Sequence, residues 1–122
     1  MAPALKATRG MWKATAMPHK RARVPLRRTF TKAEFTKLAK GFVPQSMDDR
    51  WFIFFEKGWL YFHRSWTGRC IFQIRLQAHK SGYEIAEAQV NQDPQQYRNR
   101  GTEGAAQVIS NIIDQQLLTR HT

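Results

Sequence analysis

The chain has 122 residues, of which 42% are hydrophobic and 12% are aromatic, enough to build the core of one domain. No apolar run reaches the roughly 18 residues of a membrane span, and the basic start lacks the apolar stretch of a signal peptide. We therefore expect a cytoplasmic protein with no membrane partner. The single cysteine, Cys70, excludes an internal disulfide and a cysteine zinc site. The four histidines are scattered along the chain, and we expect no metal and no cofactor.

The net charge of +11 is concentrated at the N-terminus. Residues 1–28 contain eight lysines or arginines and no acidic residue, whereas 12 basic and 9 acidic residues leave residues 29–122 at +3. Because residues 1–28 also contain three prolines and show no sustained hydrophobic periodicity, we expect a disordered or loosely attached basic tail. Such a tail is either simply solvated or binds the phosphates of a nucleic acid. Residues 29–122 are predicted to form a single α+β domain.

Three short loops that end in glycine separate the apolar runs between residues 51 and 91. They are Glu56-Lys57-Gly58, Trp66-Thr67-Gly68 and Lys80-Ser81-Gly82. A three-residue hairpin loop needs a positive φ at its last residue, which glycine adopts without steric cost. The pattern therefore predicts a four-stranded antiparallel β-meander. The pairs expected to close its loops are Phe55 with Trp59, Ser65 with Arg69, and His79 with Tyr83.

Amphipathic helices are predicted on both sides of this meander. Thr31 and Glu34 have the spacing of a capping box at the start of a short helix, which ends at Gly41. A longer helix begins at Thr102 and carries apolar side chains at helical spacing as far as Leu117. We expect the C-terminal helix to pack on one face of the sheet. The short N-terminal helix is expected beside the sheet, over the aromatic half of the other face.

The predicted registers divide the sheet into two unlike faces. The core face is apolar and contains a cross-strand row of Phe52, Phe62, Phe72 and Val90. The second face presents aromatic side chains on its first two strands, and amides with an Arg75–Glu87 pair on its last two. A surface of this kind is typical of an interface or a ligand site.

Two arginines outside the second face are added to this candidate site. Arg64 falls at the end of the core face, where it needs Asp93, a backbone carbonyl or an anionic ligand as a partner. Arg98 lies in an amide-rich loop before the C-terminal helix, a place that could hold a phosphate. The predicted ligand-binding residues are Trp51, Tyr61, His63, Arg64, Gln73, Arg75, Gln89 and Arg98.

No catalytic residue is predicted. His63 and Ser65 alternate along one strand and project to the same face, which makes a histidine-activated serine conceivable. However, no acid lies near in the sequence to orient the histidine, and no oxyanion-loop motif is visible. A turn and a hydrogen-bonded strand histidine are the favoured interpretation.

The hairpin sequence resembles a known family. The run from Asp49 to Gly68, followed by Glu87–Asn91 and Asp93–Arg98, is similar to small bacterial proteins of uncharacterised function that share a tryptophan-rich β-hairpin motif. Related segments occur in proteins with ADP-ribosylglycohydrolase or other ADP-ribose-handling domains. The resemblance covers roughly residues 30–118. It implies no catalytic residues and favours a nucleotide-derived ligand.

Two functions are therefore predicted from the sequence. The first is a small non-enzymatic binding or accessory domain that recognises a nucleotide-like ligand or a partner protein, and a homodimer could use the same face. The alternative is a nucleic-acid-binding protein whose basic tail binds phosphates while sheet aromatics stack on bases. A hydrolase is a more distant alternative. Burial of the aromatic face would exclude base stacking on it.

Overall fold

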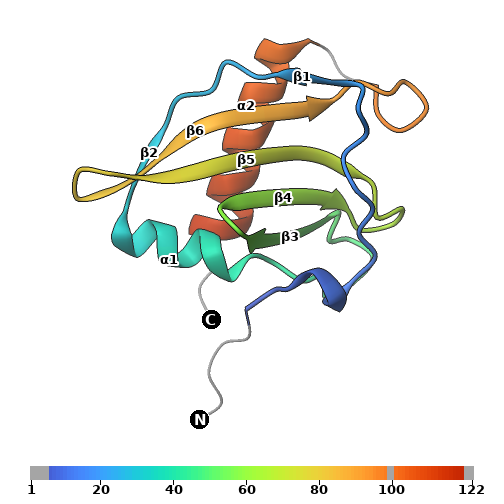
Figure 1. Ribbon diagram of the computed structural model, residues 1–122. Helices are drawn as coiled ribbons and strands as arrows, with labels where there is room; N and C mark the ends of the chain where they lie inside the picture. Colours follow the sequence, from blue (N-terminus) through green and yellow to red (C-terminus); the bar gives the residue numbers. More distant parts are fainter. Residues whose placement is uncertain (1–5, 99–100, 120–122) are drawn as a thin grey trace.

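An antiparallel sheet of six strands forms the centre of the structure, in the order β1-β6-β5-β4-β3, with β2 also paired to β6 (Figure 1). The computed structural model describes residues 6–98 and 101–119. The strands are β1 (Arg21–Arg23), β2 (Thr29–Thr31), β3 (Trp51–Glu56), β4 (Trp59–Arg64), β5 (Cys70–His79) and β6 (Gly82–Asn91). The helices are η1 (Arg9–Met11), α1 (Lys32–Lys40), α2 (Thr102–Ile112) and η2 (Ile113–Leu118). The α+β class is confirmed, but the sheet is larger than the predicted four-stranded meander.

The first hairpin has a two-residue loop where three residues were predicted. Glu56 pairs with Trp59, and the loop residues Lys57 and Gly58 have φ values of 50° and 89°. Positive φ at both central residues is the type I′ pattern that matches the twist of paired strands. A shift of one residue turns every side chain of a strand to the opposite face. The side chains of β3 are therefore reversed relative to the prediction, with Ile53 in the main core and Phe52 on the second face.

The hairpin between β5 and β6 also has a two-residue loop, because His79 pairs with Gly82. A register shift after Arg75 then restores the predicted pairing of Arg75 with Glu87. Gly82 does not have the predicted positive φ. Its small size is needed for another reason, since a Cβ there would collide with the backbone oxygen of Phe30 on β2.

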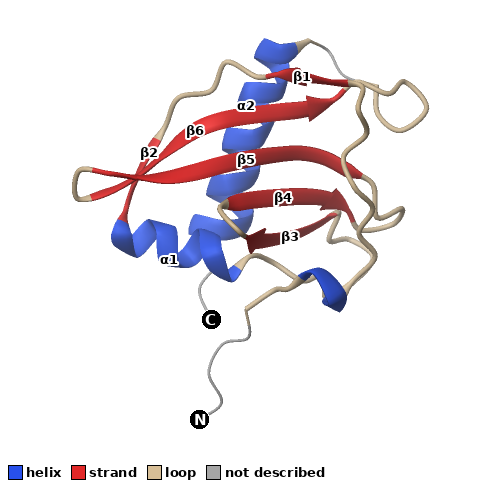
Figure 2. Ribbon diagram, in the orientation of Figure 1, coloured by secondary structure: helices blue, strands red, loops and turns tan. Residues whose placement is uncertain are grey.

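The main core lies between the sheet and the C-terminal helix, as predicted. Phe62, Phe72 and Ile74 from the sheet meet Ile109 and Ile113 from the helix, and all five side chains are fully buried. Figure 2 shows α2 running behind the sheet and continuing into η2, which has π-helical geometry. None of the helices in the described part of the chain is long and apolar enough to cross a membrane.

Helix α1 begins with the predicted capping box but does not cover the second face. Thr31 Oγ1 accepts a hydrogen bond from the Glu34 backbone N–H at 3.0 Å, and the Glu34 side chain accepts one from the Thr31 N–H at 2.9 Å. Phe35 stacks on Tyr83 with ring centroids 3.7 Å apart and meets Phe55 edge-on at 5.3 Å. The register of β3 turns Phe55 toward the main core. The apolar side chains of α1 pack with Phe55 against that core and therefore lie on that side of the sheet as well. The expectation that α1 shields the aromatic half of the second face is therefore wrong.

Residues 6–28, which we call the strap, cover that half instead. Ala7 packs with Phe52 and Phe54, and the Ala7 N–H donates to the Lys40 carbonyl at 2.8 Å. Farther along, β1 pairs with the edge of β6, and Val24 is 3% exposed within the main core. The predicted boundary at residue 28 thus does not separate a loose tail from a domain in the described residues. The strap is mostly extended, and its backbone both donates hydrogen bonds to other segments and accepts them, as in Val24 N–H to the Ala88 oxygen and Gln92 N–H to the Lys20 oxygen. Such a segment needs no hydrophobic periodicity.

Candidate functional site

A pocket of about 370 Å³ lies between the strap and the second face of β4 and β5, and we call it the strap pocket. This volume is within the usual range for small-ligand sites. The strap lines it with Arg9, Thr15, Ala16, Met17 and Arg21. The sheet lines it with Trp59, Tyr61, His63, Cys70 and Gln73.

Four of the predicted site residues meet at this pocket. Tyr61, His63 and Gln73 line it, and Gln89 is joined to it through hydrogen bonds. Gln73 Nε2 donates to Gln89 Oε1 at 2.5 Å, and Gln89 Nε2 donates to a carboxylate oxygen of Glu87 at 2.6 Å. This chain of amides fixes the orientation of the Gln73 side chain, which is 7% exposed.

The other four predicted residues lie elsewhere. Trp51 turns to the main-core side with β3, and the Arg64 guanidinium lies 4.7 Å from its ring centroid. Arg64 forms no ion pair with Asp93, and its partial burial lowers its pKa. Arg75 lines a separate groove of about 630 Å³ beside residues 23–29. Arg98 is exposed in the loop after β6 and lines neither hollow.

His63 is the most unusual polar group of the pocket wall. It is 1% exposed and stacks on Phe54 with ring centroids 5.4 Å apart. Its Nδ1 lies 2.9 Å from the Gly68 carbonyl oxygen, which can only accept a hydrogen bond, so Nδ1 carries the proton. Burial lowers the pKa of His63 and keeps the ring neutral, outweighing the opposite effect of the hydrogen bond to Gly68, and nearby Arg9 makes a smaller lowering contribution. Nε2 is then an acceptor, and it is buried without a hydrogen-bond partner among the described residues.

The lowered pKa of His63 predicts a loss of stability in mild acid. An unfolded histidine has a pKa of about 6.5, so below this value the unfolded chain binds a proton that the folded protein refuses. The free energy of unfolding should then fall by up to about 1.4 kcal/mol per pH unit, until the pH reaches the folded pKa. Urea denaturation between about pH 7.5 and pH 5 measures this slope. His63→Gln should reduce the slope. An equal slope in this variant and in the unchanged protein would contradict the assignment.

Arg9 covers two aromatic rings at the pocket. Its guanidinium lies 4.8 Å from the ring centroid of Phe54 and 5.3 Å from that of Tyr61. It also makes two contacts with the Glu56 carboxylate, at 3.2 and 3.3 Å. Burial raises the pKa of Tyr61, so its hydroxyl stays protonated. Sequence reasoning missed Arg9 because it was assigned to a loose tail.

Neither Cys70 nor Ser65 is placed to act as a nucleophile. Burial raises the pKa of the Cys70 thiol to about 12, so it is protonated and a poor nucleophile. The Ser65 hydroxyl donates to the Asp49 carbonyl oxygen at 2.7 Å, while His63 Nδ1 is paired with Gly68. The serine and the histidine therefore do not form the nucleophile–base pair of the hydrolase alternative.

The fold and the pocket together define a small α+β domain with a basic, aromatic pocket that is lined on one side by its own N-terminal segment. Comparisons of the chain with family models, curated proteins and solved structures find no match. The family resemblance noted in the sequence stays a prediction.

Proposed function

We propose that this protein is a small binding domain whose strap pocket receives a planar ligand that carries an anionic group, of the nucleotide-like class. The observation that carries the proposal is the buried acceptor Nε2 of His63 in a pocket wall that also contains arginines. Buried polar atoms are almost always hydrogen-bonded in folded proteins, so an acceptor without a partner is a candidate contact for a ligand. A ligand hydroxyl or amino group that reaches Nε2 from the pocket would satisfy it.

The charge of the pocket supports an anionic ligand. Arg9 and Arg21 line it, and no carboxylate does among the described residues. Arg9 is already paired with Glu56. Arg21 donates to the backbone oxygens of Met17 and Pro18 and to Gln89 Oε1 at 3.4 Å, and it forms no ion pair within the described part of the chain. The exposed guanidinium of Arg21 is therefore not neutralised by a carboxylate, and it can form a charge-assisted hydrogen bond with a ligand phosphate.

The remaining side chains support a planar ligand with polar edges. Tyr61 and Trp59 are half-buried and provide aromatic surface. Gln73 offers a carboxamide that is held in place by Gln89. Aromatic surface with a few oriented polar groups is typical of pockets for small organic ligands, and a nucleotide base has the planar shape and polar edges that fit it.

The test is isothermal titration calorimetry of the full chain with AMP and with ADP-ribose. Loss of a hydrogen bond to a charged group costs about 1.5–3 kcal/mol, so Arg21→Gln should weaken binding of either probe by about tenfold or more. Gln73→Ala should also weaken it. Arg75→Gln is the matched control, because Arg75 lies on the same face but outside the strap pocket. Failure of both probes to bind, or equal weakening by Arg75→Gln and Arg21→Gln, would refute the proposal.

A further inference from the structure

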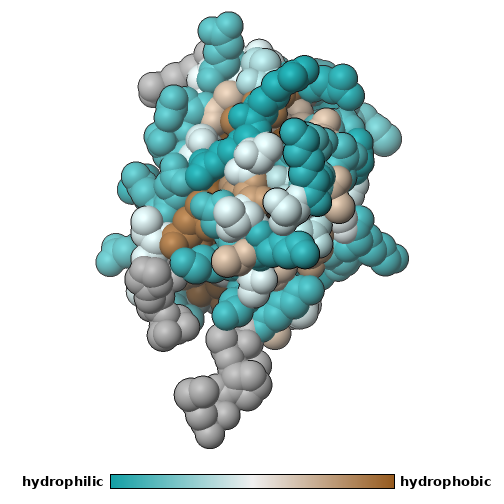
Figure 3. Space-filling model, turned by 90° about the vertical axis from the view of Figure 1, so that its left-hand side faces the viewer, coloured by the Kyte–Doolittle hydropathy of each residue, from teal (hydrophilic) through white to brown (hydrophobic). Residues whose placement is uncertain are grey.

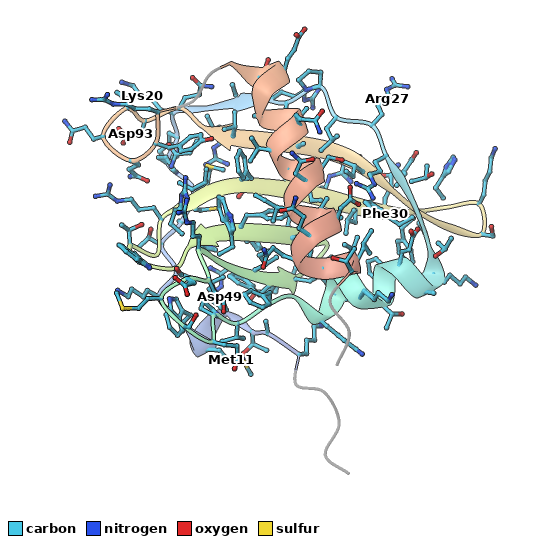
Figure 4. The ribbon with its side chains drawn as sticks, turned by 180° about the vertical axis from the view of Figure 1, so that it is seen from behind. Met11, Lys20, Arg27, Phe30, Asp49 and Asp93 are labelled. Carbon is cyan, nitrogen blue, oxygen red and sulfur yellow. The ribbon has the colours of Figure 1, made fainter. Side chains whose placement is uncertain are left out.

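Large hydrophobic side chains are exposed together at one corner of the molecule. Of the five exposed in the described part of the chain, four come from three segments that meet there: Met11 (41% exposed), Trp12 (38%), Met47 (74%) and Trp66 (64%). We call these four residues the tryptophan corner. In Figure 4, Met11 lies at the lower edge of the described part of the molecule, below Asp49. The opposite end, seen in Figure 3, is mostly hydrophilic with a narrow hydrophobic band.

Hydrogen bonds hold the two indole rings of this corner in place. Trp12 Nε1 donates to the Ser65 carbonyl oxygen at 2.6 Å, and Trp66 Nε1 donates to the Met47 carbonyl oxygen at 3.2 Å. Each indole thus satisfies its one polar group within the protein, while part of the apolar ring remains exposed. A fixed ring that needs no further hydrogen bond is suited to stacking. Clustered exposed apolar side chains on a folded chain usually mark an interaction surface.

The charges around the corner favour a polyanionic partner. Lys13 Nζ lies 2.9 Å from the Trp66 carbonyl oxygen, and the backbone oxygen of Arg50 accepts from the Ser65 N–H. Lys13 and Arg50 form no ion pair within the described residues. Arg69 also forms none there, but its guanidinium donates to the Gln95 backbone oxygen at 2.9 Å. Asp48 and Asp49 are the acids of the adjoining loop, and the whole chain carries +11. Lysines and arginines placed beside stacking rings are the equipment of single-strand binding proteins.

We propose that the tryptophan corner binds single-stranded nucleic acid, with bases stacked on Trp12 and Trp66 and phosphates contacted by the neighbouring cations. On the second face of the sheet, Phe52 and Phe54 are fully buried and cannot stack on a base. The corner does not rest on the strap pocket: Trp12 and Trp66 do not line it. A single strand is required because paired bases have no free ring face to offer.

Fluorescence anisotropy of a labelled oligothymidylate of about 15 nucleotides tests the proposal with the full chain. Trp66→Leu should weaken binding about tenfold, since stacking on one base is worth about 1–3 kcal/mol. Trp66→Phe loses the same indole N–H but keeps an aromatic ring, so it should bind better than Trp66→Leu. Val108→Thr changes the fifth exposed hydrophobic residue, on α2, and should leave binding unchanged. Raising the salt from about 50 to about 200 mM should weaken binding in every variant.

Several results would overturn the proposal. Equal binding by Trp66→Leu and the unchanged protein would mean that the ring does not stack on a base. If unlabelled duplex DNA displaced the labelled strand as effectively as unlabelled single strand does, the binding would be nonspecific electrostatic attraction without base stacking. A dimer in light scattering that Trp66→Leu dissociates would assign the corner to a second copy of this chain. Circular dichroism melting of each variant ensures that only folded proteins are compared.

Discussion

Deletion of residues 1–28 is expected to unfold most of the protein at ordinary temperature. The deletion removes the buried side chains of Met17 and Val24 and uncovers Phe52 and Phe54. Burial of each large apolar side chain contributes about 1.5–3 kcal/mol, and the entropy that the strap gains on release offsets part of the sum. A net loss on the order of 5 kcal/mol is comparable with the whole stability of a small domain. The measurement is the melting temperature by circular dichroism.

A matched control separates packing from charge in this experiment. Lys20 and Arg27 are exposed on the strap and form no ion pair within the described part of the chain. The double variant Lys20→Gln with Arg27→Gln removes two charges but no buried side chain, so its melting temperature should stay within a few degrees of the parent's. If the truncated protein also melts near the parent, the strap is a loose tail after all, as its composition suggests.

The composition of the strap led to the prediction that it is a loose tail, and its packing on the sheet could not be predicted. Eight cations and three prolines in 28 residues are typical of a solvated segment. The strap is held by contacts with residues far away in the sequence. Examples are the ion pairs of Arg9 with Glu56 and of Arg28 with Asp114. A pairing between a three-residue strand and the edge of β6 leaves no local pattern to recognise.

The meander was easier to predict than its registers. Glycine-ended loops located the hairpins, but Lys57 and Lys80 carry positive φ. An ordinary side chain in that region costs energy, so the sequence argument assigned the positive φ to glycine alone. The resulting one-residue error turned β3 over, which misplaced Trp51 at the site. Between β5 and β6, a later register shift cancelled the error and left Gln73 opposite Gln89, as predicted.

The candidate site was accordingly half predictable. Tyr61, His63 and Gln73 belong to β4 and β5, whose mutual pairing was predicted correctly where Tyr61 meets Gln73. The arginines of the pocket come from the strap, and their positions depend on its path. No sequence pattern around Arg9 predicts its position. Only the structure shows that it pairs with Glu56 and lies over the ring of Tyr61.

Gly41→Ala is expected to destabilise the protein strongly, because both its backbone conformation and its surroundings require glycine. Gly41 ends α1 with φ 66° and ψ −157°, a conformation that essentially only glycine adopts. A Cβ at this position would overlap the Ile53 carbonyl oxygen and lie 3.0 Å from Ala7 Cβ. Backbone strain of about 1–3 kcal/mol and overpacking of about 1–3 kcal/mol should together lower the free energy of unfolding by about 2–6 kcal/mol. Urea denaturation measures the loss.

Gly58→Ala provides the comparison that isolates the crowding. Gly58 also has a positive φ, 89°, but a Cβ there meets no atom within 4 Å, so the expected loss is only about 1–2 kcal/mol. If both variants lose the same stability, the junction of α1, β3 and Ala7 is looser than its geometry implies. A larger loss at Gly41 would show that this junction is tightly packed. Because Ala7 lies near the start of the strap, two residues before Arg9, packing at Gly41 also positions one wall of the strap pocket.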